Sequence, residues 1–196
     1  AMLSTLLSTF GIVFLAELPD KTALAVLVLA TRYGARQVIA GAWLAFIVQT
    51  GVGVAAGSVL TLLPARPVHV AAGIGFLVFA VLALRRDEEE ELKEEKGEVA
   101  TIARSRRRSP WMAAFLVVFA AEWGDLTQLA TASLVAKTGQ PIPVAIGAIA
   151  ALWSVTVIAV VTGSQLTRFL APELLTRASA GLFAIVGVVI IAQALR

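Results

Sequence analysis

Two acidic pairs inside long apolar segments constrain the fold of this chain more than any other feature. Glu17 and Asp20 interrupt an apolar run that extends from residue 3 to residue 30, and Glu122 and Asp125 interrupt a later one in the same way. A charge at the middle of a bilayer costs roughly 2.5–3.5 kcal/mol on insertion scales. Ionisable groups at that depth therefore indicate a functional site.

Composition indicates an integral membrane protein. Apolar residues make up 59% of the chain and the mean hydropathy is +0.88, well above the values of soluble domains. Sixteen of the 29 charged side chains lie between Arg85 and Arg108, which leaves the other segments nearly free of charge. The high pI of about 9.8 therefore reports on membrane orientation, and we expect no nucleic-acid partner.

The absence of cysteine excludes disulfides, thiolate ligands and cysteine nucleophiles. Any bound metal must then be held mainly by oxygen. The first apolar run is too long for the core of a signal peptide and carries charges, so we interpret it as a retained span.

At about 20 apolar residues per spanning helix, the sequence predicts an all-α membrane protein with six transmembrane helices. These helices are expected at about 3–31, 36–62, 67–84, 110–136, 141–170 and 172–195. They form two three-helix units, residues 1–84 and 110–196, joined by a charged linker at 85–109.

The two units are related in sequence. Residues 119–130 repeat residues 14–25, and Gly57 to Thr61 resembles Gly163 to Thr167. An odd number of spans in each unit places the two copies in opposite orientations, so we predict an inverted repeat, as in many secondary transporters.

The distribution of Lys and Arg predicts the orientation, because positive loops stay in the cytoplasm. Twelve basic residues fall on the linker side and three on the other, while Lys21 lies within a span. We therefore expect a cytoplasmic linker, both termini outside, and residence in the cell (inner) membrane.

The acidic pairs have the chemistry of a cation site. Residues three apart share one face of a helix, so Glu17 with Asp20 and Glu122 with Asp125 can each present two carboxylates to one point. Pro19 and Gly124 loosen the helix beside them and can free backbone carbonyls for a hard cation. Neutral oxygens are available from three further side chains: Thr22, Thr127 and Gln128.

The doubled pattern Glu-x-Gly-Asp-Lys/Arg-Ser/Thr resembles that of the Gdt family of membrane cation exchangers, whose members are implicated in manganese and calcium transport coupled to protons. The resemblance covers both halves and implies that Glu17, Asp20, Glu122 and Asp125 are cation ligands, with Thr22 and Thr127 at the polar positions that follow. The chain departs from the pattern twice. Pro19 replaces the glycine of the first copy, and Leu126 replaces the basic residue of the second.

We therefore expect a secondary transporter and not an enzyme, exporting Mn²⁺ or Ca²⁺ in exchange for protons by alternating access. Two alternatives stay open at this point: an intramembrane aspartyl protease that uses a pair of aspartates, and a structural membrane protein whose charges pair internally. The expected partners are the divalent cation, protons and the lipid bilayer, with no prosthetic group. A homodimer is left open.

Overall fold

The computed structural model describes residues 2–17, 22–85, 109–162 and 172–195, and all regular structure in these ranges is helical. The helices are α1 (Met2–Glu17), α2 (Thr22–Tyr33), α3 (Ala35–Leu60), α4 (Ala65–Arg85), α6 (Pro110–Ala121), α7 (Leu126–Thr138), α8 (Pro141–Thr162) and α10 (Pro172–Ala194).

Glycine and proline set the helix boundaries. Gly34 has a φ of 94° and precedes α3, and Gly139 ends α7 in the left-handed region with its N–H bonded to the Val135 carbonyl. Pro110 and Pro141 are the first residues of their helices, where the missing N–H has no intrahelical partner to lose.

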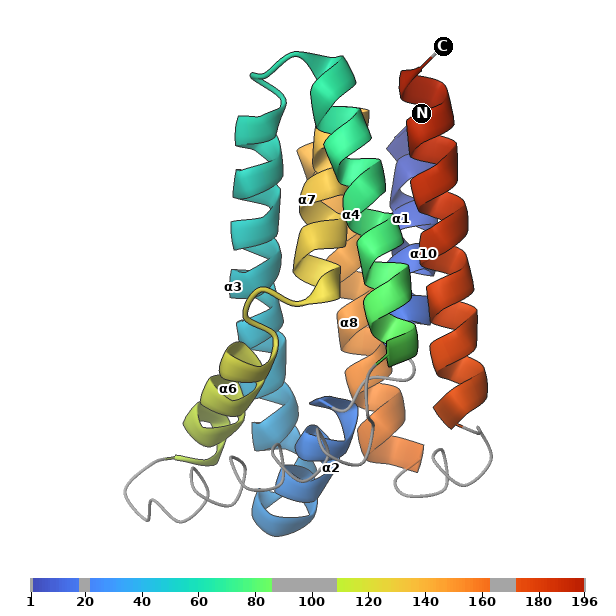
Figure 1. The fold of residues 1–196 in the computed structure, drawn as a ribbon. Coiled ribbons are helices and arrows are strands. Elements are labelled where there is room, and N and C mark those ends of the chain that lie inside the picture. Colours follow the sequence, from blue (N-terminus) through green and yellow to red (C-terminus); the bar gives the residue numbers. More distant parts are fainter. Residues whose placement is uncertain (1, 18–21, 86–108, 163–171, 196) are drawn as a thin grey trace.

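Four helix contacts build the bundle: α3 packs against both α6 and α7, α1 packs along α8, and α4 packs along α10 (Figure 1). Both termini lie at one end of the molecule, together with the turn between α3 and α4. The packed core is apolar, with Val38, Val118 and Val26 fully or almost fully buried among its residues.

Glycines bring backbones close together at two equivalent places. A Cβ atom on Gly147 of α8 would lie 2.6 Å from the Leu6 carbonyl oxygen of α1, and one on Gly41 of α3 would collide with the Trp111 carbonyl of α6. The pairs α1–α8 and α6–α3 thus use the same kind of contact, at positions that match in the repeated sequence.

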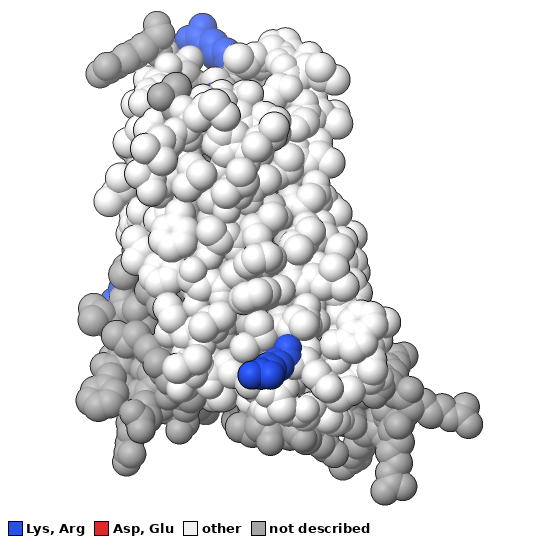
Figure 2. Space-filling view, turned by 180° about the vertical axis from the view of Figure 1, so that it is seen from behind, with Lys and Arg blue, Asp and Glu red and all other residues white. Residues whose placement is uncertain are grey.

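The outer surface of the described residues is apolar. Figure 2 shows a face that is almost entirely uncharged, with a few basic side chains and no acidic one among the described residues. Large apolar side chains such as Leu7, Val59 and Ile185 are exposed. A surface of this kind suits contact with lipid.

One of the expected helices is wrong as a continuous element, because the segment expected at 110–136 is divided into α6 and α7. The segment expected at 3–31 contains α1 and α2, and residues 18–21 between them lie outside the described residues. Within the part of the chain that the structure describes, three helices are long and apolar enough to cross a membrane: α3, the 65–82 part of α4, and the 141–161 part of α8. The six-span arrangement therefore stays a prediction.

Candidate cation site

The second acidic stretch forms a break between two helices. Glu122 caps the end of α6, and its N–H bonds the Val118 carbonyl at 3.0 Å. Gly124 then adopts a φ of 76°, a conformation that favours glycine, and Asp125 is extended. The reversal at Gly124 ends the helix and lets a new one begin at Leu126.

Asp125 is the N-cap of α7. Its Oδ1 accepts a hydrogen bond from the N–H of Gln128 at 2.9 Å, and its Oδ2 accepts from the N–H of Thr127 at 3.2 Å. The Thr127 hydroxyl also donates to Oδ2, at 2.9 Å. These bonds fix the carboxylate, and its negative charge lies at the positive end of the helix dipole.

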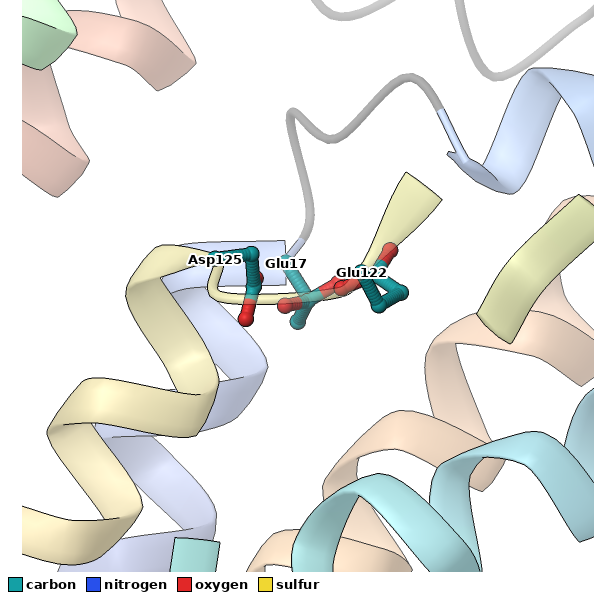
Figure 3. Close-up of side chains that lie close together, drawn as sticks. All are labelled: Glu17, Glu122 and Asp125. Atoms are coloured by element: carbon teal, nitrogen blue, oxygen red, sulfur yellow. The ribbon is translucent and has the colours of Figure 1, made fainter. Parts of the chain in front are cut away.

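The first acidic stretch contributes Glu17, the last residue of α1. Glu17 is 4% exposed and Glu122 is 3% exposed. One carboxylate oxygen each from Glu17, Glu122 and Asp125 lie within 4.8 Å of one another. Figure 3 shows Glu17 between the other two side chains, so both halves of the chain supply the cluster.

Three carboxylates this close, two of them buried and the third partly buried, repel one another if all are ionised. Protons or a nearby cation lower this repulsion, and an uncompensated buried charge costs several kcal/mol. The cluster is therefore suited to exchanging protons for a metal ion.

The sequence predicted that the two acidic stretches would converge, but the reason given for the closeness of the second acidic pair was wrong. Glu122 and Asp125 do not share a helix face, since they lie on either side of a break and are brought together by the turn at Gly124. Asp20 lies outside the described residues. Thr22 is buried in the first turn of α2, and Thr127 reaches the cluster through Asp125.

One residue that the sequence analysis missed is Gln49 of α3, which is 4% exposed. Its Nε2 donates to the Phe119 carbonyl at 2.8 Å, and its Oε1 accepts from Nε2 of Gln128 at 2.7 Å. An amide in the middle of a long apolar helix is the signal that could have identified it.

Comparison with known proteins decides the family. The sequence model of the divalent cation/proton antiporter GDT1 matches two segments, residues 5–91 and 110–196, each of which contains one acidic stretch. The chain belongs to the GDT1 family. Because GDT1 proteins are described as antiporters, this chain is a transporter and not an enzyme, and the protease hypothesis is set aside.

Relatives of this GDT1 chain come from a cyanobacterium and from plants. It is 31% identical to the GDT1-like protein sll0615 of Synechocystis over 148 residues, which cover 69% of this chain and 72% of the relative. It is 29% identical to the PAM71-homolog of Arabidopsis thaliana, a chloroplastic protein, over 90% of this chain and 56% of that relative. It is 28% identical to GDT1-like protein 5 of Oryza sativa subsp. japonica over 96% and 94%.

The chain thus spans little more than half the length of the chloroplastic PAM71-homolog. No solved structure matches it.

Proposed function

We propose that this protein exports Mn²⁺, or Ca²⁺, from the cytoplasm in exchange for protons, and that Glu17, Asp20, Glu122 and Asp125 hold the ion. The observation that carries the proposal is the convergence of three carboxylates from two repeated stretches at a helix break. Thr22 and Thr127 are the proposed neutral ligands.

The donor chemistry favours a hard divalent cation. Carboxylate, hydroxyl and carbonyl oxygens suit Mn²⁺, Mg²⁺ and Ca²⁺, whereas Zn²⁺ and Cu²⁺ prefer sulfur or imidazole. The chain has no cysteine, and its one histidine, His69, lies near the start of α4 and outside the carboxylate cluster.

The same carboxylates provide the coupling. Protons neutralise the buried cluster when no metal is bound, and a divalent ion displaces them when it binds. Because the same carboxylates bind both the metal ion and the protons, the site cannot hold the metal ion and its full set of protons at the same time.

The helix pairs support alternating access between two inverted repeats of three spans each. The sequence repeat matches α1 with α6, α3 with α8, and α4 with α10. Under this correspondence the α1–α8 contact is equivalent to the α6–α3 contact, and the α4–α10 contact is equivalent to itself. Where α3 and α8 meet, the rings of Trp43 and Trp153 stack with centroids 4.2 Å apart. Rocking of one repeat against the other would expose the site to each side in turn.

The proposed orientation keeps the linker at 85–109 in the cytoplasm and both termini outside, in the cell membrane. Its support is the excess of Lys and Arg on the linker side and the shared location of the two termini (Figure 1).

Transport by purified protein in liposomes tests the proposal. An imposed pH gradient should drive Mn²⁺ or Ca²⁺ movement, with protons moving the opposite way, and Glu17→Gln, Glu122→Gln and Asp125→Asn should each abolish it. The matched control is Glu94→Gln, which makes the same change in the charged linker and should leave transport intact. Wild-type rates in two of the three site variants would refute the assignment of the site.

A further inference from the structure

Two glutamines connect the helix break to α3 through a chain of hydrogen bonds. The Gly124 N–H donates to Oε1 of Gln128 at 2.9 Å, Nε2 of Gln128 donates to Oε1 of Gln49 at 2.7 Å, and Nε2 of Gln49 donates to the Phe119 carbonyl at 2.8 Å. The chain begins and ends on the backbone of the segment that carries Glu122.

The direction of this chain is fixed by its two ends. A backbone N–H can only donate and a carbonyl can only accept, so each amide must point its oxygen toward Gly124 and its nitrogen toward Phe119. Neither side chain can turn over without placing two donors or two acceptors against each other.

The bonded backbone groups are those that the helix break releases. In a continuous helix the Trp123 N–H would bond the Phe119 carbonyl, but it lies 3.4 Å from the Ala120 carbonyl instead. Gln49 takes the place of that lost donor. Because a buried carbonyl without a partner costs about 1–3 kcal/mol, Gln49 stabilises the broken geometry at the part-buried Phe119 carbonyl, while the bond of Gln128 to Gly124 lies in an exposed part of the break.

Close packing brings α3 to this position. A Cβ atom on Gly53 would lie 2.9 Å from the Gln128 carbonyl oxygen, and one on Gly57 would collide with the Ala132 carbonyl. The backbones of α3 and α7 are therefore in contact along the turns that follow Gln49.

The other repeat lacks these groups. Aligning the two halves places Ala23 at the position of Gln128, Val155 at that of Gln49 and Ala159 at that of Gly53. Neither Ala23 nor Val155 can form an amide chain, so these aligned positions give the first acidic stretch no equivalent of the Gln49–Gln128 link.

We propose that Gln49 is a positioning residue for ion binding, which acts through Gln128 to fix residues 119–125 on α3 and so holds Glu122 and Asp125 at the distance from Glu17 that the ion requires. The proposal rests on the proposed function. It also assigns Gln128 a positioning role, because both ends of its amide are engaged by Gly124 and Gln49.

A double-mutant cycle tests the role in transport. We expect Gln49→Leu and Gln128→Leu each to raise the KM for Mn²⁺ about tenfold in liposomes with a smaller change in maximal rate. The double variant should be no worse than either single variant, because each alone already breaks the chain. The control is Ser58→Ala, which removes a 2.8 Å hydrogen bond to Val54 within α3 and should leave KM unchanged.

Thermal unfolding separates positioning from stability. The double variant should recover part of the stability that each single variant loses, because no amide is then left facing an apolar side chain, yet its KM should stay high. Additive effects on KM would show that Gln128 acts on the ion independently of Gln49. An unchanged KM in Gln49→Leu would overturn the proposal.

Hydrogen–deuterium exchange tests the chain of bonds without transport. In wild-type protein the Gly124 amide should be protected, and Gln49→Leu should release it although Gln49 does not contact that amide. Unaltered protection in Gln49→Leu would refute the link from Gln49 through Gln128 to Gly124. Failure of the wild-type protein to move Mn²⁺ or Ca²⁺, with this protection still dependent on Gln49, would refute the transport proposal and leave the structural link standing.

Discussion

The hydroxyl of Thr127 donates to the carboxylate of Asp125, with Oγ1 2.9 Å from Oδ2. This bond holds a site carboxylate in one rotamer and leaves lone pairs on the hydroxyl oxygen for a cation.

Thr127→Val should therefore weaken Mn²⁺ binding about five- to tenfold, because it removes both the bond and the neutral oxygen while keeping the shape of the side chain. Thr127→Ser retains the hydroxyl and should bind nearly as well as wild type. Calorimetric titration of the purified variants provides the measurement. Equal affinities for the valine and serine variants would exclude a role for the hydroxyl.

Gly41 and Gly51 lie on the same helix, and substitution by alanine should affect them in opposite ways. A Cβ atom on Gly41 collides with the Trp111 carbonyl, whereas one on Gly51 meets nothing within 4 Å. Gly41→Ala should destabilise the protein by about 1–3 kcal/mol, and Gly51→Ala should be neutral or stabilising by up to about 1 kcal/mol. Thermal unfolding in detergent measures both. A Gly41→Ala protein as stable as Gly51→Ala would contradict the close α3–α6 contact.

Leu126→Lys restores the basic residue that the second motif lacks. In the proposed site, four ionised carboxylates and the ammonium of Lys21 would sum to a charge of −3, so one divalent ion would leave −1, and a proton held on Glu122 or Asp125 would neutralise it. A lysine at position 126 should replace that proton and lower the pH needed for metal binding. It should also weaken affinity at alkaline pH, where it competes with the metal. Calorimetry across pH, with Leu126→Met as the uncharged control, gives the midpoint; an unshifted midpoint in the lysine variant would show that position 126 does not act on the site.

The orientation can be measured with single cysteines, because the chain has none of its own. Ser105→Cys, in the linker, should resist a membrane-impermeant thiol reagent in intact cells and react after the cells are opened. Leu62→Cys, in the turn between α3 and α4 where the native side chain is 82% exposed, should react from outside. The reverse pattern would invert the proposed topology.

Much of the site could be predicted from the sequence, because doubled acids in apolar segments have few purposes other than a shared site. Glu17, Glu122 and Asp125 meet as expected. The backbone conformation that brings Glu122 and Asp125 together was not predictable. Their spacing of three residues fits both a continuous helix and the helix break that the structure shows. The break depends on the positive φ of Gly124 and on the capping of α7 by Asp125. Both are local conformations that depend on the tertiary contacts around them.

Gln49 was missed for a related reason. A single amide in an apolar helix is not matched by any other residue in the sequence pattern, and Gln128 was considered only as a source of a neutral ligand oxygen. The link between them depends on the close approach of α3 and α7 at Gly53, which no spacing within one helix can reveal.

The helix α6 ends just before Glu122 and the helix α7 begins just after Asp125, so both ends lie beside the carboxylate cluster. The carbonyl end of α6 carries about half a negative charge and the amide end of α7 about half a positive charge, and both belong to the backbone, so no change of pH removes them. These two backbone charges largely offset each other. In the proposed exchange, the attraction of the site for a cation therefore follows the protonation of its carboxylates, and the helix ends add no fixed preference for either load.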